Sequence, residues 1–486
     1  MNIILKGFDD HMCKPLSEGM TAGLPLKLCI SIMDYPDRLP HLPENVEHIV
    51  MPARPLRAGQ YPGTDWSTIT PLDEELIEAM ANTEVMFHTM IERYAVYGDI
   101  PYDERKRQYY RHLRYWNHLL TEKKIDLLVI RGAPHQCFDL VLYDLCKLKG
   151  IRTLSTSPYF LLNAFSVETD WKDDGSQLEK RMQELRQIYR DPSVPIELSP
   201  EFEASFERYT RDKKDQWYMK EWYKQPQSPQ IPLARRSFVS RWAGTAMHLL
   251  VHKPRYLFSS IVSQQFWRRK LAQHRVVRLY DRLAQEPDFS VPYVYVPLHM
   301  QPEVTTCPMG GAYVDQELIV QMLGACLPKG VRMYVKEHPT QSERWRSEAF
   351  YKALHDVPSV TIVPRECSTF TLIEHAQAIA SVTGTAMFEG IFKGKPAMMF
   401  GHKYFQFAPG VHRVRSLADC KCAVEEIFVH KKKPTLRELR MFLKAVEDTT
   451  GLSYAWERSV RPPEAMEERA KKMGQYIQQA IVAACA

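Results

Sequence analysis

The sequence lacks several features that define whole classes of protein. Its ten cysteines are scattered, and no two of them form a C-x-x-C pair. A zinc site and a disulfide framework are therefore poorly supported, and reduced thiols in a cytosolic protein are the better interpretation. No uncharged apolar run approaches the roughly 18–20 residues of a membrane span. The N-terminus also lacks the basic region, the long apolar region and the cleavage site of a secretory signal.

Internal repeats and low-complexity tracts are also missing. The 486 residues leave room for two or three domains, at about 150 residues each. Apolar residues make up 45% of the chain and charged residues 25%. These values are ordinary for a soluble globular protein with a sizeable core.

Acidic residues are scarce in one segment, residues 216–278. It holds 12 lysines and arginines against the single acid Glu221, so it carries +11 where the whole chain carries +6. Ten aromatic residues are interleaved with these charges. The default interpretation is a set of amphipathic helices whose cations are solvated. The functional hypothesis is docking on an anionic membrane surface. Nucleic acid ranks last, because no recognised nucleic-acid module accompanies the basic segment.

Strands and helices alternate in two parts of the chain, which predicts parallel sheets covered on both faces. In the first part the expected strands are Asn2–Lys6, Leu26–Ile32, His48–Met51, Asp126–Ile130 and Arg152–Ser155. The expected helices there are Asp73–Tyr94, Asp103–Thr121 and Gln136–Lys149. In the second part the expected strands are Tyr293–Pro297, Arg332–Lys336, Val360–Val363, Ala378–Val382 and Ala397–Phe400. The helices between them are Asp315–Cys326, Ser342–Leu354 and Ser368–His375, and the chain ends in helices Thr435–Asp448 and Pro463–Ala484.

This pattern predicts an α/β fold with two doubly wound Rossmann-like domains in a GT-B-like arrangement. Ligands of such sheets bind outside the carboxyl ends of the strands. The expected units are an acceptor-side domain at residues 1–165 and a helical basic and aromatic insertion at 166–286. A nucleotide-sugar domain follows at 287–433, and C-terminal helices at 434–486.

The segment 381–396 carries the most information. It reads as a buried strand, a small-residue turn at Thr383-Gly384-Thr385, a short helix and a new strand. Such a turn aims backbone N–H groups at one point, where a phosphate binds well. Glu389 stands one turn into the helix. It is not at the position of a capping-box acid, so it is available for another ligand, such as a ribose hydroxyl.

Two more strand ends are expected at the same edge of the second sheet. One is followed by Leu298-His-Met-Gln-Pro-Glu-Val-Thr-Thr306, and the other by Lys336-Glu-His-Pro339. The loops that follow neighbouring parallel strands converge, so these distant segments are predicted to share one ligand.

These motifs resemble bacterial capsule polysaccharide biosynthesis proteins, a group that includes β-Kdo transferases and is distantly similar to polysialyltransferases. The resemblance covers about residues 290–410 and is carried by Tyr295–Gly311, Lys336–Pro339 and Thr383–Pro396, and more faintly by Arg131–His135. It implies a GT-B glycosyltransferase whose nucleotide-sugar donor binds the C-terminal domain.

The resemblance also implies roles for individual residues. His338 and Pro339 would contact the phosphate and base of the nucleotide, Thr383, Gly384 and Thr385 would cradle phosphate, and Glu389 would hold ribose. Gln301, Glu303 and Thr305 would face the sugar or the cleft. Together with Lys336, these groups can stabilise a phosphate leaving group without a metal. No D-x-D motif stands out in the cleft loops, and we expect neither a metal nor a cofactor.

Plainer interpretations exist for the same residues. His338 on its own reads as a loop residue that caps a helix. Thr383 and Thr385 have the side chains of ordinary N-caps. Glu303 on its own would simply pair with a lysine.

In the first unit, the strand that ends at Ile130 is followed by a loop that leads to His135 and Asp139. An imidazole suits a general base on an acceptor hydroxyl, and Asp139, one helical turn further, would orient the ring. A turn histidine packed on the strand is an equally good interpretation. Retaining Kdo transferases use a carboxylate, and the sequence does not separate Asp34, Asp139 and Asp144 for that role.

The leading hypothesis is a cytoplasmic glycosyltransferase, peripheral at the inner membrane face. It would move Kdo or another acidic sugar from a nucleotide donor, with CMP favoured, onto a surface polysaccharide or lipid-linked glycan. The alternatives are a GT-B-shaped nucleotide-sugar epimerase or polyol-phosphate transferase, and a non-catalytic glycan- or partner-binding scaffold of capsule assembly.

Overall fold

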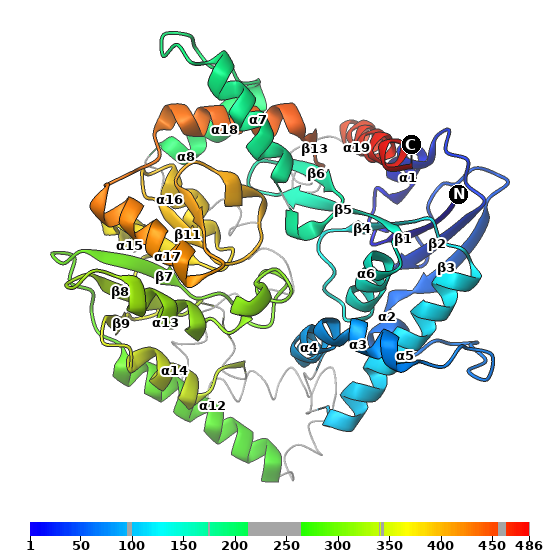
Figure 1. Ribbon diagram of the computed structural model, residues 1–486, viewed down its shortest axis with the longest axis horizontal. Coiled ribbons are helices and arrows are strands. Elements are labelled where there is room, and N and C mark those ends of the chain that lie inside the picture. Colours follow the sequence, from blue (N-terminus) through cyan, green and yellow to red (C-terminus); the bar gives the residue numbers. More distant parts are fainter. Residues whose placement is uncertain are drawn as a thin grey trace.

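A computed structural model describes residues 1–94, 100–173, 175–211, 264–339, 341, 345–454 and 463–485. Figure 1 shows two sheets with helices packed around each, the N-terminal sheet on the right and the C-terminal sheet on the left. The expected fold of two doubly wound sheets is confirmed. Most of the basic segment 216–278 lies outside the described residues, so the membrane-docking hypothesis stays a prediction. No described helix is long and apolar enough to cross a membrane.

The N-terminal sheet has seven strands in the order β13-β6-β5-β4-β1-β2-β3. The first five strands of the chain are parallel, and β6 and β13 add to the edge in antiparallel pairings. Their bounds are β1 Asn2–Lys6, β2 Leu28–Met33, β3 Glu47–Pro52, β4 Leu127–Arg131, β5 Arg152–Tyr159, β6 Ala164–Glu168 and β13 Gly451–Leu452. The helices of this region are α1 Cys13–Thr21, α2 Ala53–Arg57, α3 Glu74–Ala79, α4 Ala81–Met90, η1 Ile91–Tyr94, α5 Tyr102–Glu122 and α6 Phe138–Leu148.

The C-terminal sheet has six strands in the order β12-β11-β10-β7-β8-β9, and all of its pairings are parallel. The strands are β7 Tyr293–Pro297, β8 Arg332–Lys336, β9 Val360–Ile362, β10 Ala378–Ser381, β11 Ala397–Met399 and β12 Val411–Arg413. The helices around it are α12 Gln264–Leu283, α13 Glu317–Cys326, α14 Glu348–His355, α15 Thr369–His375, α16 Thr385–Ile391 and α17 Leu417–Val424.

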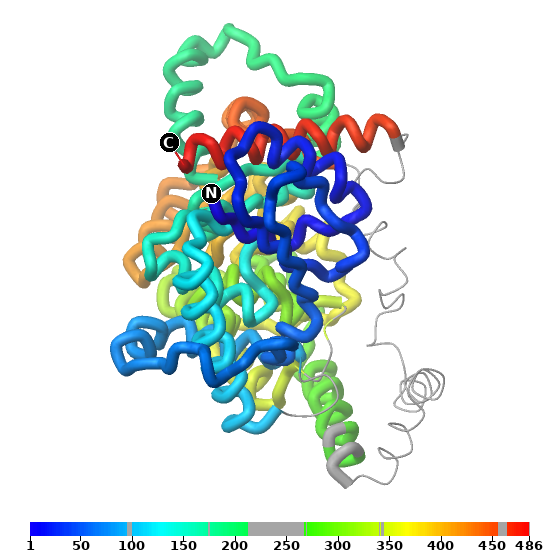
Figure 2. Tube along the Cα trace, turned by 90° about the vertical axis from the view of Figure 1, so that its right-hand side faces the viewer, coloured from blue at the N-terminus to red at the C-terminus, as the bar shows by residue number. Residues whose placement is uncertain are grey.

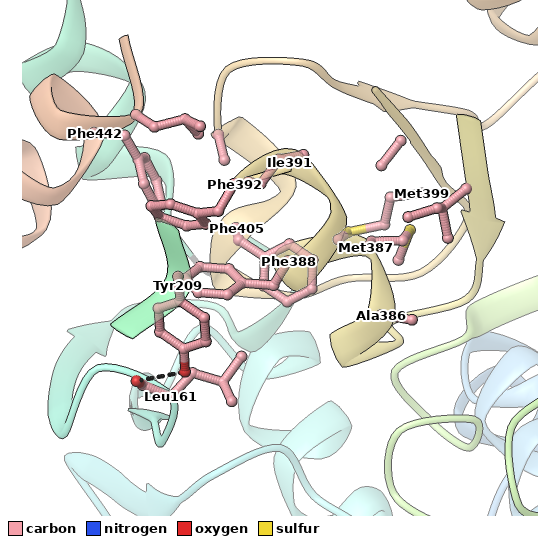
Figure 3. Packing of buried hydrophobic residues seen from close by; sticks show 14 of the residues in the cluster. Leu161, Tyr209, Ala386, Met387, Phe388, Ile391, Phe392, Met399, Phe405 and Phe442 are labelled. Carbon is pink, nitrogen blue, oxygen red and sulfur yellow. Dashed lines mark hydrogen bonds between the residues drawn. The ribbon is translucent and has the colours of Figure 1, made fainter. Parts of the chain in front are cut away.

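Alternate residues of each central strand feed two cores, because successive strand side chains point to opposite faces. In β7, Tyr293 and Tyr295 join one buried cluster, whereas Val294 and Val296 join the other. Figure 3 shows how the first cluster holds α16, with Phe388 and Phe392 packed beside Tyr209, whose hydroxyl donates to the carbonyl of Leu161 at 3.0 Å. This packing therefore holds α16, the helix that follows the Thr383–Thr385 turn, in place.

The segments between and after the two sheets tie the halves together. Helices α7 Ser176–Ile188 and α8 Pro200–Thr210 pack against α18 Leu436–Thr449. The predicted boundary between residues 165 and 166 falls inside β6. It was drawn where the strand–helix alternation gives way to charged, aromatic-rich helices, at about Val167, and β6 extends past that point.

The C-terminal helix α19, Pro463–Cys485, returns to the N-terminal domain and packs along α1. Figure 2 shows it in red, beside the blue N-terminal segment. The two helices touch backbone to backbone at a pair of glycines. A Cβ on Gly19 would lie 2.3 Å from the carbonyl of Lys471, and one on Gly474 would lie 2.1 Å from the carbonyl of Leu16. Any larger residue at either position would push the helices apart.

Candidate functional site

The site lies where the chain reverses its direction of winding in the C-terminal sheet. β7 and β10 are neighbours, but the chain continues from β7 to β8 on one side and from β10 to β11 on the other. The region outside their carboxyl ends, here called the C-terminal crevice, is the usual ligand position in such sheets. His299 follows β7 by two residues, and Thr383 follows β10 by two residues.

A directed chain of hydrogen bonds joins the two strand ends. The backbone N–H of Thr383 donates to Nε2 of His299 at 3.2 Å, so the ring proton is on Nδ1. Nδ1 lies 3.3 Å from the hydroxyl of Thr305, which donates to Oε2 of Glu303 at 2.7 Å. The hydroxyl of Thr383 closes the structure by donating to the carbonyl of Thr305 at 2.9 Å. The turn at residue 383 is thereby coupled to the Glu303 carboxylate.

His299 is a neutral imidazole at the centre of this arrangement. Burial lowers its pKa to about 3, and electrostatic interactions with His338, Arg346 and Lys403 act in the same direction. A Cβ on Gly384 would lie 3.2 Å from Nε2 of His299, closer than most Cβ contacts, so a larger residue there would crowd the ring. Segments that follow β7, β8 and β10 therefore meet around one imidazole, as the sequence predicts.

Glu303 is a partly buried carboxyl group that faces two cations. Burial raises its pKa, while the Thr305 hydrogen bond and the charges of Lys403 and Arg93 oppose the rise. Arg93, in η1 of the N-terminal domain, donates to the carbonyl of Cys307 at 2.6 Å and also to the carbonyl of His135. Arg93 thus joins the His135 loop of the N-terminal domain to the loop of the C-terminal domain that carries Glu303 and Cys307.

Two predicted donor-binding residues are engaged inside the protein. The side-chain amide of Gln301 donates to the carbonyl of Val314, and its oxygen accepts from Arg346. Nζ of Lys336 donates to the carbonyl of Cys367 at 2.5 Å and to the hydroxyl of Thr369 at 2.9 Å, and burial lowers its pKa to about 8. Both side chains support neighbouring loops in this structure, which the strand-end pattern alone did not reveal.

A buried ion pair supports the two histidine-bearing loops. Nε of Arg346 lies 2.7 Å from Oε2 of Glu337, and the Tyr351 hydroxyl donates to the same oxygen at 2.7 Å. Burial raises the pKa of Glu337, but Arg346 outweighs it and holds the pKa below its ordinary value. Glu337 accepts from the backbone N–H of His338 at 2.8 Å, and Arg346 donates to the carbonyl of His299 at 2.9 Å.

The turn itself differs from a simple capping structure. The N-cap of α16 is Gly384, with no side-chain cap hydrogen bond, so the interpretation of Thr383 and Thr385 as N-caps is wrong. The N–H and hydroxyl of Thr383 both form hydrogen bonds within the protein, and Gly384 and Thr385 are partly exposed. Glu389 is also partly exposed and acts with burial to raise the pKa of Tyr295.

His338 and Pro339 are partly exposed at the end of β8. Burial lowers the pKa of His338, while the Glu337 carboxylate opposes that change. The ring therefore favours its neutral form beside the neutral His299. The neutral imidazole of His338 and the ammonium of Lys403 are donors suited to a phosphate ester, whereas both ring nitrogens of His299 are already used within the protein.

On the N-terminal side, Asp139 does not orient His135 by a hydrogen bond. Nδ1 of His135 lies 2.8 Å from the carbonyl of Ala133, whereas Asp139 accepts from the N–H of Gln136 at 2.7 Å and pairs with Nζ of Lys6 at 2.8 Å. Burial raises the pKa of Asp139, but Lys6 reverses this and keeps the pKa low. The Asp139 carboxylate, in the first turn of α6, is therefore held by the N–H of Gln136 and by Lys6 and not by the His135 ring.

The structure separates the three carboxylates that the sequence left equivalent. Asp139 is fully buried in its ion pair. Asp144 accepts from the Thr83 hydroxyl at 2.7 Å, and burial raises its pKa. Asp34 retains 34% exposure beside Arg57 and lies 3.4 Å from Nε2 of Gln136. Asp34 is therefore the one of the three that solvent reaches most directly.

Four residues around the site were not predicted. His299 lies in the loop 298–306 after β7, and its position directly after a buried strand could have indicated a role in the site. Arg346, Lys403 and Arg93 come from other segments, and no local pattern links them to the site. No group of three or more His, Cys, Asp or Glu suited to a metal ion occurs in the described ranges. All ten cysteines are free thiols.

Comparison with known proteins supports the family resemblance. Residues 269–444 match the model of the family described as "Capsule polysaccharide biosynthesis protein". This part of the chain contains β7–β12 and the whole strand-end site. No curated protein matches the chain significantly.

Solved structures that match the chain do so weakly. The β-Kdo 2,4 transferase KpsC of Thermosulfurimonas dismutans has a TM-score of 0.31 and 14% identity, covering 66% of this chain and 79% of that chain. The β-Kdo 2,7 transferase of the same organism has a TM-score of 0.27 and 10% identity, covering 77% and 97%. The UDP-GlcNAc 2-epimerase of Methanocaldococcus jannaschii has a TM-score of 0.26 and 11% identity, covering 92% and 98%. Likenesses of this size do not establish an activity.

Proposed function

We propose that this protein is a glycosyltransferase that transfers a sugar from a nucleotide donor to a surface polysaccharide or lipid-linked glycan. The observation that carries the proposal is the hydrogen-bond chain from Thr383 through His299 and Thr305 to Glu303. It connects a turn suited to a phosphate with a carboxyl group that faces the other domain. A transferase needs both parts, one for the leaving group and one for the reacting hydroxyl.

In this proposal the donor phosphate binds at Gly384 and Thr385, beside His338 and Lys403. Glu389 holds the ribose, and Pro339 borders the base. Breaking the bond between the sugar and the phosphate leaves negative charge on the phosphate, and the His338 imidazole and the Lys403 ammonium stabilise that charge. A CMP-sugar is the favoured donor, and the acidic sugars it carries are the favoured cargo.

Glu303 is proposed as the general base on the acceptor hydroxyl. Its raised pKa brings its proton exchange closer to neutral pH than that of an ordinary carboxyl group, which suits this task. The acceptor enters from the N-terminal side, past His135 and Asp34. We place the protein in the cytoplasm, peripheral at the inner membrane face, where such acceptors are built.

The test is a donor screen by thermal shift with CMP, UDP, GDP and CDP, run on the wild type and on His338→Ala. We expect one nucleotide at about 100 times its Kd to stabilise the wild type by about 2.7 kcal/mol, and the variant to lose most of this effect. His355→Ala is the matched control, because His355 is exposed on α14 of the same domain. A protein that no nucleotide stabilises would be a non-catalytic scaffold instead.

A second measurement separates a transferase from an epimerase. Nucleotide release from the matching nucleotide sugar is followed with and without a polysaccharide acceptor. Release that depends on the acceptor supports transfer. Conversion of the donor sugar to its epimer without any acceptor would replace the proposal.

A further inference from the structure

A second candidate binding site lies on the N-terminal domain, in a pocket between α5 and the loop that precedes α3. The pocket has a volume of about 450 Å³, which is within the range of small-ligand sites. The helix contributes Arg107, Tyr110, Arg111 and Arg114, at the spacing of one continuous helix face. The loop contributes Tyr61 and Trp66. Figure 1 shows α5 on the N-terminal half of the molecule, and no lining residue comes from the C-terminal sheet.

The aromatic part of this pocket is held in place before any ligand binds. The ring of Tyr61 stacks on Tyr115 with centroids 3.8 Å apart, and its hydroxyl lies 2.6 Å from Nδ1 of the buried His112. Trp66 packs edge-on against Tyr61 at 6.0 Å. A ligand therefore meets a preformed apolar wall and does not have to order it.

The three arginines have different tasks. Arg114 fastens the loop, because it donates to the carbonyls of Trp66 at 2.9 Å, Ile69 at 2.5 Å and Thr70 at 3.1 Å. Arg107 pairs with Asp103 at the exposed surface. Arg111 is exposed and makes no hydrogen bond or ion pair with any residue that the structure describes. Arg111 is the cation left over for a ligand.

From this combination we infer that the pocket binds a sugar residue that carries a carboxylate. Trp66 and Tyr110 line the pocket with aromatic rings, the kind of flat apolar surface against which the C–H groups of a pyranose pack. Arg114 lies over the Trp66 ring at 5.8 Å from its centroid, and Lys106 lies over the Tyr110 ring at 5.5 Å. A guanidinium binds a carboxylate through two parallel hydrogen bonds. A neutral sugar would leave Arg111 without a partner, and a bare phosphate would leave the aromatic surfaces uncovered.

The inference rests in part on the proposed function, because a transferase that extends an acidic polysaccharide needs to hold the chain away from the reacting end. A second binding site for the growing polysaccharide raises the effective concentration of its reacting end at the active site. The pocket belongs to the domain on which the acceptor is proposed to enter. It shares no residue with the strand-end site.

The test is calorimetric titration of the full-length protein with a tetramer of galacturonic acid, at about 0.15 M salt to screen general charge attraction. Maltotetraose serves as the neutral ligand of the same length, and inorganic phosphate as the bare anion. We expect the acidic tetramer to bind and the other two to bind at least about tenfold more weakly, as loss of a charge-assisted hydrogen bond predicts. Equal binding of maltotetraose, or tighter binding of phosphate, would overturn the inference.

Variants locate the binding on the protein. Arg111→Gln is expected to weaken binding of the acidic tetramer about tenfold or more. Trp66→Phe is expected to weaken it about threefold. Arg152→Gln is the matched control for charge, because Arg152 is exposed on β5 and outside the pocket. An equal loss in Arg152→Gln and Arg111→Gln would mean non-specific attraction and would reject the site. The melting temperature of each variant verifies that it is folded.

The outcome is separable from that of the proposed function. Nucleotide stabilisation is measured on the same Arg111→Gln protein and is expected to be unchanged. Nucleotide binding without any binding of the acidic tetramer would reject the pocket alone. Tetramer binding that depends on Arg111, in a protein that transfers no sugar, would reject the transferase alone.

Discussion

The molecule contains two crevices of the same topology, and they are filled in opposite ways. In the N-terminal sheet the crevice lies between β1 and β4, and the corresponding pair in the C-terminal sheet is β7 and β10. The N-terminal crevice is closed by an ion pair of 2.8 Å between Arg131 and Asp10, and by the hydroxyl of Tyr454, which donates to Asp10 at 2.7 Å. The C-terminal crevice is bridged without an ion pair, by the neutral imidazole of His299, which accepts from the N–H of Thr383, and by the hydroxyls of Ser381 and Thr383, which donate to the carbonyls of Pro297 and Thr305.

This difference explains why the phosphate is proposed in one domain and the acceptor in the other. Around the N-terminal strand ends the cations Lys6, Arg57 and Arg131 are each paired with an aspartate. An anion there would compete with a carboxylate already in place. The C-terminal crevice has its own buried ion pair, Glu337 with Arg346, which supports the histidine loops, and the His338 ring beside it is partly exposed.

The largest expected effect comes from Glu303→Gln, which tests whether the reacting carboxylate is on the C-terminal side. The amide cannot accept a proton, so kcat is expected to fall by about 10²–10⁴ while nucleotide stabilisation is kept. The paired variant Asp34→Asn, on the N-terminal side, is expected to lower the rate less than about tenfold, because Asp34 is already paired with Arg57. Initial-rate measurements decide, and the reverse order of effects would move the base to the N-terminal domain.

The next effect compares the two buried ion pairs. Arg346→Met and Lys6→Met each leave a buried carboxylate without its partner, which costs about 3–5 kcal/mol of unfolding free energy. Only Arg346→Met is expected to abolish the thermal shift by nucleotide, because Arg346 also holds the His299 carbonyl. Urea unfolding and thermal shift on both variants provide the measurement. Loss of the shift in Lys6→Met as well would show that the two crevices are not independent.

A third prediction concerns His112, a neutral imidazole in the core of the N-terminal domain and the counterpart there of His299 at the C-terminal crevice. Burial lowers the pKa of His112 to about 3, against about 6.5 in an unfolded chain. The unfolded state then binds more protons below pH 6.5, so stability falls as the pH falls. Between pH 7 and pH 5 this one residue is expected to cost about 2 kcal/mol. Urea titrations of the wild type and of His112→Gln verify this, since the variant should show a smaller loss over that interval.

The smallest effect sharpens the role of the hydrogen-bond chain. Thr305→Val removes the donor that opposes the rise in the Glu303 pKa. The carboxyl then takes up its proton at higher pH, so the acidic limb of the kcat/KM profile is expected to move upward by about one pH unit. An unchanged limb would mean that Glu303 does not set the profile. Thr361→Val, on β9, is a control of the same chemistry.

The sequence predicts the central strands well, because buried parallel strands are continuous apolar runs with clear ends. Asn2–Lys6, Tyr293–Pro297 and Arg332–Lys336 are found with the predicted bounds. The helix expected over Asp73–Tyr94 is divided at Met80 into α3 and α4, followed by η1, without a proline or glycine to signal the breaks. The short helix α1 was missed, since its apolar face is completed only by α19, more than 400 residues later.

The site could be predicted only as far as local patterns reach. The convergence of the three strand-end loops follows from the order of strands, and His338 and Gly384 were proposed as site residues on that basis. The link between them was not, because it depends on His299, whose ring approaches Gly384 closely only in the folded crevice. Arg93 comes from the other domain, so no spacing in the sequence connects it with Cys307.

The glycine contact between α1 and α19 has a consequence for how this chain is made. The N-terminal sheet receives its last strand, β13, and the cover of one of its faces from the final part of the chain. On the ribosome, the N-terminal sheet therefore keeps apolar surface uncovered until β13 and α19 have emerged, by which point every strand of the C-terminal sheet has been made. The order of maturation is then inverted, with the later of the two sheets assembled first.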